Sequence, residues 1–568
     1  MISILVLIVM VIFFLGYRLY GGFLTRQFDL DNSRPTPACQ VNDGVDYVPA
    51  KPAMLLGQHF SAIAAAGPIV GPILACIWFG WLPTLLWIVV GAILIGGVHD
   101  FSSLVASIRH KASSIGEIVK QYMSPTSHIL FLIFVWFALI YVIIAFTDIT
   151  ANTFKTISDG QAFGSGVAAS SILYLFAAVL MGILLYRFKL KLWIATVIFL
   201  PVVLLIVWIG PHLPGIILRA FASLSVKQWD IAILLYCFIA SVIPLWLLLQ
   251  PRGYLGGWFL YLIIFIGLIG ALFGGFKIQY PAFNTEGLRS LATGKLIFPV
   301  LFITVACGAC SGFHGIVSSG TTSKQLSKER DAVPVGYGAM LLEGIVAMLA
   351  MATVMMISRG DSILKSDPNL IYANGIARYL DLVGINFSIA FPFALLAFST
   401  FVYDTLDVCT RLARYILQEL LGIKSRAGGL VAAVVTLIIP LVFLMLTKEK
   451  GYLVAWPIFG TSNQLLASLT LLAISIWLTK TGKNAIYAIL PMIFMLVMTL
   501  WSLITLTLPF INLLPGIFEG VAVKPDTMIS GICGIILFAL SIMLIIEAVK
   551  ALVIKTGKGK EVVNDMAR

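Results

Sequence analysis

The chain has 568 residues, of which 60% are hydrophobic and 11% are charged, and its formal net charge is +12. A soluble domain is about 45–50% apolar and about 25% charged, so this composition excludes an ordinary soluble protein. The apolar residues lie in blocks of about 18–25, the length of a helix that crosses about 30 Å of hydrocarbon. The sequence therefore predicts an all-α protein that crosses the membrane many times.

About fifteen blocks along the chain are predicted to span the membrane. They cover about 2–19, 58–80, 82–106, 127–147, 169–187, 190–210, 231–249, 255–275, 297–320, 336–357, 386–410, 428–447, 455–479, 484–507 and 528–549. The first block has neither a basic start nor a small-residue cleavage site, so it is predicted to be a retained helix rather than a signal peptide.

The positively charged residues favour one orientation in the membrane. If the N-terminus lies outside, the cytoplasmic loops and the C-terminal tail hold about twice as many Lys and Arg residues as the opposite loops. This bias predicts an N-terminus outside and a C-terminus in the cytoplasm. The surplus of positive charge is then explained by the cytoplasmic loops, which can contact anionic lipid head groups. It does not require a nucleic-acid partner.

The second predicted span contains two Gly-Pro pairs, Gly67-Pro68 and Gly71-Pro72, in the middle of the membrane. Proline lacks the backbone N–H and clashes with the carbonyl four residues before it, so this helix is predicted to kink or unwind. Unwound backbone at membrane depth is tolerated only where it is buried in protein or lines a cavity. The simpler alternative is a proline kink with close packing at the glycines.

The ninth predicted span is unusually small and polar. Its segment 305–324, "VACGACSGFHGIVSSGTTSK", contains no Leu. Gly308, Gly312 and His314 within it predict a second unwound segment. The alternative is a small-residue face for tight helix packing.

The two interrupted spans run in opposite directions in the predicted topology. Each begins a unit of five spans, and paired interrupted helices in inverted repeats are a pointer to a transporter site. The predicted architecture is thus a five-plus-five inverted repeat with extra helices. Its parts are 1–57 (N-terminal helix and cytoplasmic loop), 58–210 (first repeat), 231–275 (inserted helix pair), 297–479 (second repeat), 484–549 (C-terminal helix pair) and 550–568 (cytoplasmic tail).

Half-helices at such breaks offer free N–H groups and a positive dipole end to an anionic substrate. The residues predicted to line the substrate site are His59, Ser61, Gly67, Gly71, Gly308, Ser311, Gly312 and His314. For the histidines, and for His99 in the third span, the alternative is a purely structural role.

Five acidic residues fall within predicted spans: Asp100, Glu343, Asp404, Asp407 and Glu547. A charge at membrane depth is costly, so it usually faces a partner or a water-filled cavity. Asp100, Glu343 and Asp404 are predicted at similar depths, where they are candidates for ion coupling or gating; a structural network is the alternative. Asp407 is expected to form a local ion pair with Arg411, four residues later.

Two hydroxyls in the eleventh span, Ser399 and Thr400, lie at mid-membrane depth. Together with carbonyls freed near Ala66 and Ile69, they are candidates for an oxygen-only cage that holds Na⁺. The alternative is that these hydroxyls bond to carbonyls of their own helix. A coupling proton on Asp404 is a second possibility, because burial favours the neutral carboxyl group.

Asn463 and Gln464, near the start of the thirteenth span, are candidates for an outer gate. No motif of an enzyme is found, and the absence of a phosphate-binding loop argues against an ATP-driven pump. Cys307 and Cys310 form a C-x-x-C without a second pair at zinc spacing, so no metal site is expected. The sequence predicts no catalytic residue and no cofactor beyond a bound Na⁺ or a coupling proton.

Several motifs together resemble one family. They are "RPTPA" with "NDGVDYVPAKP" (34–52), "GQHFSAIAAAGPIVGP" (57–72), "HDFSSL" (99–104), "VACGACSGFHGIVSSGTTSKQL" (305–326), "DTLDVCTRLARYILQE" (404–419) and "WPIFGTSNQLLA" (456–467). The chain is similar in these motifs to the carbon starvation protein A family. The resemblance implies a LeuT-like fold of the amino acid–polyamine–cation superfamily. It also implies a bacterial inner-membrane transporter of peptides or pyruvate, in some members a proton symporter.

The sequence therefore predicts a secondary active importer of a small carboxylate or a short peptide, used under carbon starvation. The alternative is a channel, or a membrane nutrient sensor that transports little. Substrate, coupling ion and oligomeric state stay open.

Overall fold

The computed structural model describes residues 1–43, 47–157, 162–244, 246–423, 425–447, 450–518 and 525–553. Most of the predicted cytoplasmic tail, 554–568, lies outside these residues.

The first half of the described chain is a series of helices, some of which continue into each other through π-helical turns. They are α1 (Ile2–Leu15), α2 (Gly21–Gln27), α3 (Pro37–Val41), α4 (Pro52–Ile63), α5 (Gly67–Phe79), α6 (Trp81–Gly91), α7 (Gly97–Arg109), α8 (Ile115–Tyr122), α9 (Pro125–Phe154), α10 (Phe163–Tyr186), α11 (Leu192–Ile209), α12 (Gly215–Ser223), α13 (Val226–Val242) and α14 (Leu249–Phe273). The turn Gly16–Tyr20 joins α1 to α2, and the turn Ala92–Gly96 joins α6 to α7.

The second half begins with a small antiparallel pair of two-residue strands, β1 (Thr285–Glu286) and β2 (Arg289–Ser290). The helices that follow are α15 (Ile297–Thr304), α16 (Gly312–Gly320), a π-helical turn at Val333–Gly338 that leads into α17 (Ala339–Met355), α18 (Pro368–Asp381), α19 (Phe387–Leu421), α20 (Arg426–Leu446), α21 (Tyr452–Lys480), α22 (Ile486–Phe518) and α23 (Pro525–Val553). Short 3-10 turns lie at Gly210–His212, Thr322–Lys324, Glu329–Asp331 and Ser362–Lys365.

The all-α membrane architecture is confirmed. Within the described residues, twelve helices are long and apolar enough to cross a membrane, and two bent helix pairs bring the number to fourteen. The expected fifteen spans are reached only if α15 and α16, which are separated by residues 305–311, together form one more span. The five-plus-five repeat and its boundaries stay predictions.

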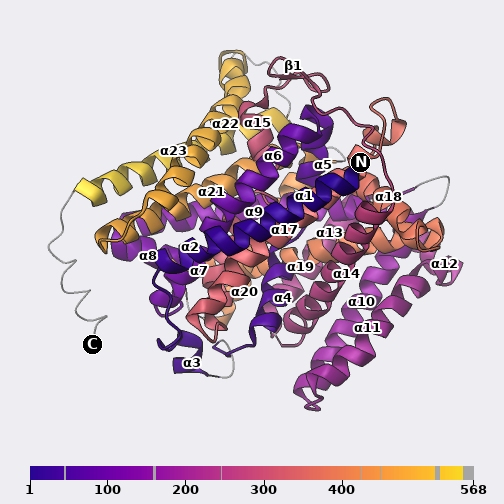
Figure 1. Ribbon diagram of the computed structural model, residues 1–568, viewed down its shortest axis with the longest axis horizontal. Helices are drawn as coiled ribbons and strands as arrows, with labels where there is room; N and C mark the ends of the chain where they lie inside the picture. Colours follow the sequence, from indigo (N-terminus) through magenta and orange to yellow (C-terminus); the bar gives the residue numbers. More distant parts are fainter. Residues whose placement is uncertain are drawn as a thin grey trace.

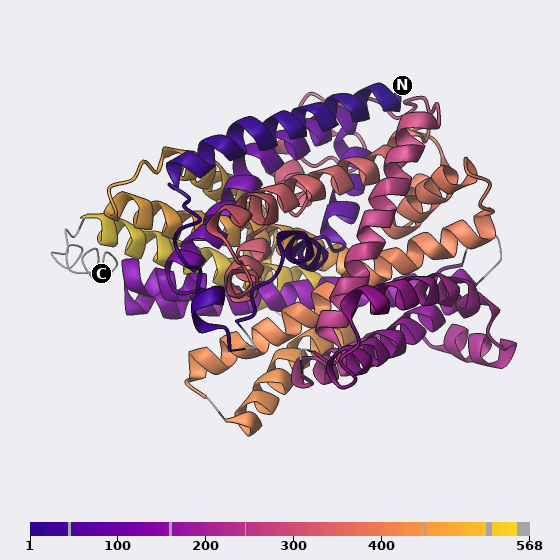
Figure 2. The same ribbon diagram turned by 60° about the horizontal axis from the view of Figure 1, so that its bottom comes forward.

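The helices form one bundle with its most buried members in the middle (Figure 1). Helices α9, α17, α19 and α21 lie there, and α21 is buried along its most apolar stretch. Helices α10, α11 and α12 form one edge and α22 and α23 the opposite edge (Figure 1). Helix α1 runs along the outer surface of the bundle (Figure 2). The middle of the bundle therefore shields its polar groups from lipid.

Several helix ends carry the caps that their sequences offer. Ser114 accepts a hydrogen bond from the Glu117 amide at the start of α8, and Ser124 does the same for the Ser127 amide of α9. Such caps satisfy N–H groups that have no partner within the helix. The starts of α8 and α9 are thus each fixed by a capping side chain.

Candidate functional site

The first break in a spanning helix lies between α4 and α5, at residues 64–66, where the chain bends by 50°. Pro72 has no N–H to donate, so the helical partner of the Pro68 carbonyl is missing. The Ala66 carbonyl, however, accepts hydrogen bonds from the amides of Ile69 (3.1 Å) and Val70 (2.8 Å). The Ala66 carbonyl therefore closes the first turn of α5, whereas the Pro68 carbonyl nearby is left without a helical partner, and the predicted Na⁺ site stays a prediction.

The second break lies between α15 and α16, at residues 305–311, and two neighbouring side chains of α21 bond to its two ends. Asn463 accepts a hydrogen bond from the Phe313 amide at 3.0 Å and donates one to the Ser311 hydroxyl at 3.0 Å. Gln464 donates to the Phe302 carbonyl at 2.5 Å. Because a break leaves backbone groups without helical partners, these two side chains supply the partners that the break needs.

These contacts give Asn463 and Gln464 a structural role, and their predicted role as an outer gate stays a prediction. Asn463 lies eleven residues after Tyr452, the first residue of α21, which is roughly 16 Å along the helix. Both side chains are buried, at 2% and 0% exposure. They hold the second break in the middle of the bundle.

The two breaks pack directly against each other. A Cβ atom added to Gly67 would lie 2.3 Å from Cys307 Sγ, and one added to Gly71 would lie 2.4 Å from the Thr304 carbonyl oxygen. A Cβ on Gly308 would meet Ala347 at 2.6 Å. These glycines are required because the facing atoms, backbone at Gly71 and side chains at Gly67 and Gly308, leave no room for a Cβ atom. Both the interruption of the helices and the close glycine packing are therefore present.

We expect Gly71→Ala to destabilise the protein by at least about 1–3 kcal/mol, the usual cost of overpacking a core. The added methyl group meets the backbone of Thr304, which cannot rotate away. Gly22→Ala is the matched control, because a Cβ at Gly22 meets nothing within 4 Å. Thermal unfolding in detergent measures both variants, and equal melting temperatures would contradict the close packing of the breaks.

Four buried side chains beside the second break form a chain of contacts that we call the relay: His99, Asp100, His314 and Glu343. His314 Nδ1 lies 2.7 Å from Asp100 Oδ2, and the other oxygen of Asp100 lies 2.7 Å from His99 Nδ1. His314 Nε2 lies 3.2 Å from Glu343 Oε2. His314 therefore bridges two of the acids that were predicted to share a polar zone.

The relay has no solvent exposure, and all four side chains are fully buried. The carboxylate oxygens of Glu343 accept no well-aligned hydrogen bond from the described residues. A bare buried carboxylate is costly, so such a group is neutralised by a proton or by a neighbouring charge. Alternating carboxyl and imidazole groups can hold a proton at several adjacent atoms. Chains of such side chains are typical of proton relays in membrane proteins.

A second buried group, which we call the arginine cluster, consists of Ser61, Tyr236, Arg252, Asp404 and Asp407. Arg252 Nε lies 3.2 Å from Asp404 Oδ1, and its Nη1 contacts Asp407 and the Tyr236 hydroxyl. Ser61 donates to Asp404 at 2.9 Å. The positive charge of Arg252 thus compensates two acids, and it joins α14 to α19.

The expected local pair of Asp407 with Arg411 is wrong. Arg411 instead donates to the carbonyls of Ala240 and Ile243, each at 2.7 Å, at the end of α13. Those carbonyls lack helical partners, and a cation near a helix C-terminus is favourable. Asp407 instead forms its ion pair with Arg252, which lies on a helix far away in sequence.

The remaining predicted residues are placed as follows. His59 Nδ1 lies 2.9 Å from the Thr322 hydroxyl. Ser399 donates to the Leu396 carbonyl of its own helix at 3.0 Å, in line with the simpler alternative, and Thr400 has no hydrogen-bond partner among the described residues. The Na⁺ cage and the assignment of substrate-site residues stay predictions.

A cavity of about 510 Å³ lies next to these clusters, between α16 and α19. Ile316 and Ser319 line it from α16, and Val408 and Arg411 line it from α19. It thus begins about one helical turn from His314 and Asp407. None of the eight residues predicted to bind substrate is among its lining residues, since those residues are packed in and around the two breaks.

Sequence reasoning missed Arg252 and Tyr236. Arg252 stands between Pro251 and Gly253, and this run resembles a loop before the eighth predicted span, whereas α14 already begins at Leu249. The available signal was the surplus of buried acids: two carboxylates one helical turn apart in α19, Asp404 and Asp407, require a cation from another helix.

Comparisons with known proteins identify the family of the chain. The family described as carbon starvation protein CstA matches residues 1–371 and 361–502. A relative from Helicobacter pylori named peptide transporter CstA is 33% identical over 572 residues, which cover 88% of this chain and 81% of that protein. The Escherichia coli pyruvate/proton symporter BtsT is 30% identical over 584 residues, covering 87% and 80% of the two chains.

Among solved structures, an Eremococcus coleocola manganese transporter is similar with a TM-score of 0.44 and 14% identity, covering 88% of this chain and 94% of that one. The family assignment rests on the sequence matches, which extend over most of the chain. The protein therefore belongs to the carbon starvation protein CstA family.

Proposed function

We propose that the protein is a proton-coupled importer of a small carboxylate such as pyruvate, or of a short peptide. The observation that carries this proposal is the relay, in which His314 links Asp100 at 2.7 Å and Glu343 at 3.2 Å beside the second break. Side chains that exchange protons so close to interrupted helices can couple proton binding to movement of those helices.

The names of the relatives support the same proposal. One relative is named a pyruvate/proton symporter and others are named peptide transporters. These substrates are chemically related, because pyruvate and peptides both carry a carboxylate. Sodium coupling is the alternative, and the relay favours the proton because its protonatable side chains lie beside the second break.

The cavity between α16 and α19 is large enough to hold such a substrate. Its volume of about 510 Å³ lies within the usual range for a small-molecule pocket, about 300–1,000 Å³. Lys324 and Arg411 on its wall outnumber the single acid, Glu419, so the wall carries a net positive charge that attracts an anion. In the orientation that the loop charges favour, with the N-terminus outside the inner membrane, this cavity faces the cytoplasm and would release substrate there.

Uptake into proteoliposomes tests the proposal. Labelled pyruvate and a labelled dipeptide are offered with an inward proton gradient, with an inward Na⁺ gradient, or with neither. We expect one of the two substrates to accumulate only under the proton gradient. Accumulation under the Na⁺ gradient alone would show that sodium is the coupling ion. Rapid flux that does not depend on any gradient would indicate a channel.

A further inference from the structure

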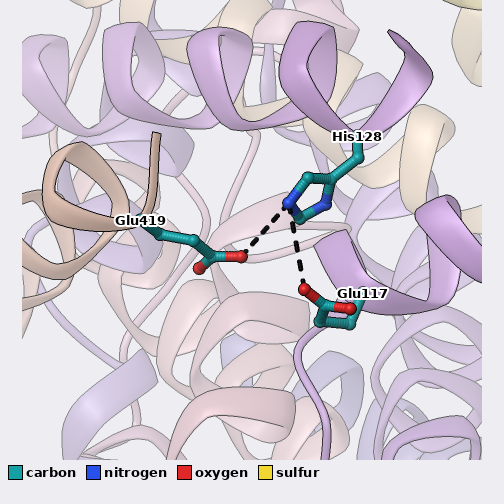
Figure 3. Close-up of side chains that lie close together, drawn as sticks. All are labelled: Glu117, His128 and Glu419. Atoms are coloured by element: carbon teal, nitrogen blue, oxygen red, sulfur yellow. Dashed lines mark ion pairs between the residues drawn. The ribbon is translucent and has the colours of Figure 1, made fainter. Parts of the chain in front are cut away.

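A group of three side chains lies at the end of the bundle that is predicted to be cytoplasmic, away from the relay and the arginine cluster. Figure 3 shows Glu117 of α8, His128 of α9 and Glu419 of α19 pointing toward one another. His128 Nε2 lies 3.3 Å from Glu419 Oε1 and 3.9 Å from Glu117 Oε1. One ligand atom from each residue lies within 4.8 Å of the other two.

The orientation of the His128 ring is fixed by the backbone. Its Nδ1 lies 2.9 Å from the Gly116 carbonyl oxygen, which can only accept a hydrogen bond, so Nδ1 carries a proton. With no metal bound, Nε2 holds a second proton toward the two carboxylates, and a metal ion that binds there displaces this proton and takes the lone pair of Nε2. An imidazole that donates through one nitrogen to a carbonyl and offers the other nitrogen is the usual arrangement of a metal-binding histidine.

The spacing of the three atoms suits a small divalent cation. Ligands at about 2.0–2.2 Å from a tetrahedral Zn²⁺ lie about 3.3–3.6 Å from one another. The two distances from Nε2 are 3.3 and 3.9 Å, and the carboxylates of Glu117 and Glu419 are partly exposed and free to adjust. One imidazole with two carboxylates favours Zn²⁺ or Mn²⁺ over Ca²⁺ or Mg²⁺, which prefer oxygen alone.

We propose that Glu117, His128 and Glu419 bind a divalent transition-metal ion that ties α8 and α9 to α19. The fourth ligand is water, because both carboxylates reach the surface. Lys120 competes for the same site, since its Nζ lies 3.3 Å from Glu117 Oε1. That ion pair is exposed and therefore weak, so a metal ion can displace it.

Zinc binding to the purified full-length protein in detergent tests the proposal. The protein is dialysed against Zn²⁺ and the bound metal is measured by mass spectrometry. We expect one zinc per chain, and a loss of affinity of at least about tenfold in both His128→Ala and Glu419→Gln. Glu419→Gln leaves the bond of His128 to Gly116 intact, so it separates metal binding from local unfolding.

Two further variants make the test sharper. His212→Ala is the matched control, because His212 Nδ1 also lies close to a carbonyl, that of Trp208 at 2.6 Å, but its ring is exposed and has no carboxylate partner among the described residues. It should leave zinc binding unchanged. Lys120→Ala should tighten zinc binding by up to about fivefold, because the competing charge is removed. Equal zinc binding by wild type, His128→Ala and Glu419→Gln would overturn the site.

The position of the site suggests a consequence for transport, which rests on the proposed function. Gly116 and Glu419 both line the cavity between α16 and α19, so a bound metal ion would hold two sides of that cavity together. We expect Zn²⁺ to slow uptake severalfold in wild type and not in Glu419→Gln. If zinc binds but uptake is unaffected, regulation by the metal is wrong while the binding site stands.

Discussion

Glu343→Gln is expected to abolish accumulation of substrate under a proton gradient while leaving exchange of substrate across the membrane intact. Gln has the size of a protonated Glu but can neither release nor take up a proton. The relay would then be held in a state equivalent to the protonated one, in which the carrier still moves its substrate in both directions. Without release of the proton, the gradient cannot drive net uptake.

Two measurements in proteoliposomes separate these effects. Proton-driven accumulation should fall to background, whereas counterflow of labelled substrate against internal unlabelled substrate should persist. Glu547→Gln is the matched control: Glu547 also lies in a membrane helix, but its partners are Ser124 and Lys550 rather than the relay. It should accumulate substrate as wild type does.

Asp404 supplies the competing assignment, because burial also makes it a candidate for the coupling proton. Its contacts argue otherwise, since Arg252 and Ser61 already compensate its charge. If Asp404→Asn lost accumulation but kept exchange, and Glu343→Gln did not, coupling would belong to the arginine cluster instead. Loss of both accumulation and exchange in Glu343→Gln, with a folded protein, would contradict the role given to the relay.

The sequence predicts the interrupted helices because their cause is local. Pro68 and Pro72, which lack N–H groups, lie in the first turns of α5, and the break falls just before them, at residues 64–66. The small residues around Gly312 favour close packing against another helix. Which atoms complete the breaks cannot be predicted in this way. Asn463 and Gln464 are about 150 residues from the second break in sequence, and only the fold brings α21 beside it.

The predicted ends of the spans explain two further omissions. Hydropathy stops at a charged residue, so the fourth span was expected to end at 147 and the seventh to begin at 231. In the structure, α9 extends to Phe154 and α13 begins at Val226, so Asp148 and Asp230 are buried within helices. Asp148 accepts a hydrogen bond from the Tyr452 amide at 2.7 Å, a partner that no local pattern reveals.

The partner choice of the acids in α19 was wrong for a related reason. An i,i+4 pair of Asp407 with Arg411 is favourable on an exposed helix, where water compensates the charges that stay unpaired. In a buried helix, every charge and every free carbonyl requires a partner. Arg411 therefore bonds to the end of α13, and Asp407 to Arg252, an arrangement that is decided by the whole packed bundle.

Arg252→Met is expected to destabilise the protein by about 3–5 kcal/mol, the cost of removing one partner of a buried charge cluster. Methionine fills similar volume, so the effect is electrostatic rather than a cavity. The charges of Asp404 and Asp407 would be left without their cation in a region where neither side chain is more than 5% exposed. A strongly reduced melting temperature in detergent, or failure to obtain folded protein, is the expected result.

The same cluster provides the rescue that distinguishes charge from packing. Combining Arg252→Met with Asp404→Asn and Asp407→Asn removes all three charges, so most of the lost stability should return even though no ion pair is restored. Arg187→Met, at an exposed arginine, is the control, and its stability should be close to that of wild type.

If Arg252→Met alone were as stable as wild type, the two acids would have to be neutral already, and the triple variant would then bring no gain in stability. If instead the triple variant stayed as unstable as the single one, the contribution of Arg252 would lie in its packing against Tyr236 and Tyr403, which its guanidinium faces at 5.6 and 5.1 Å from the ring centres.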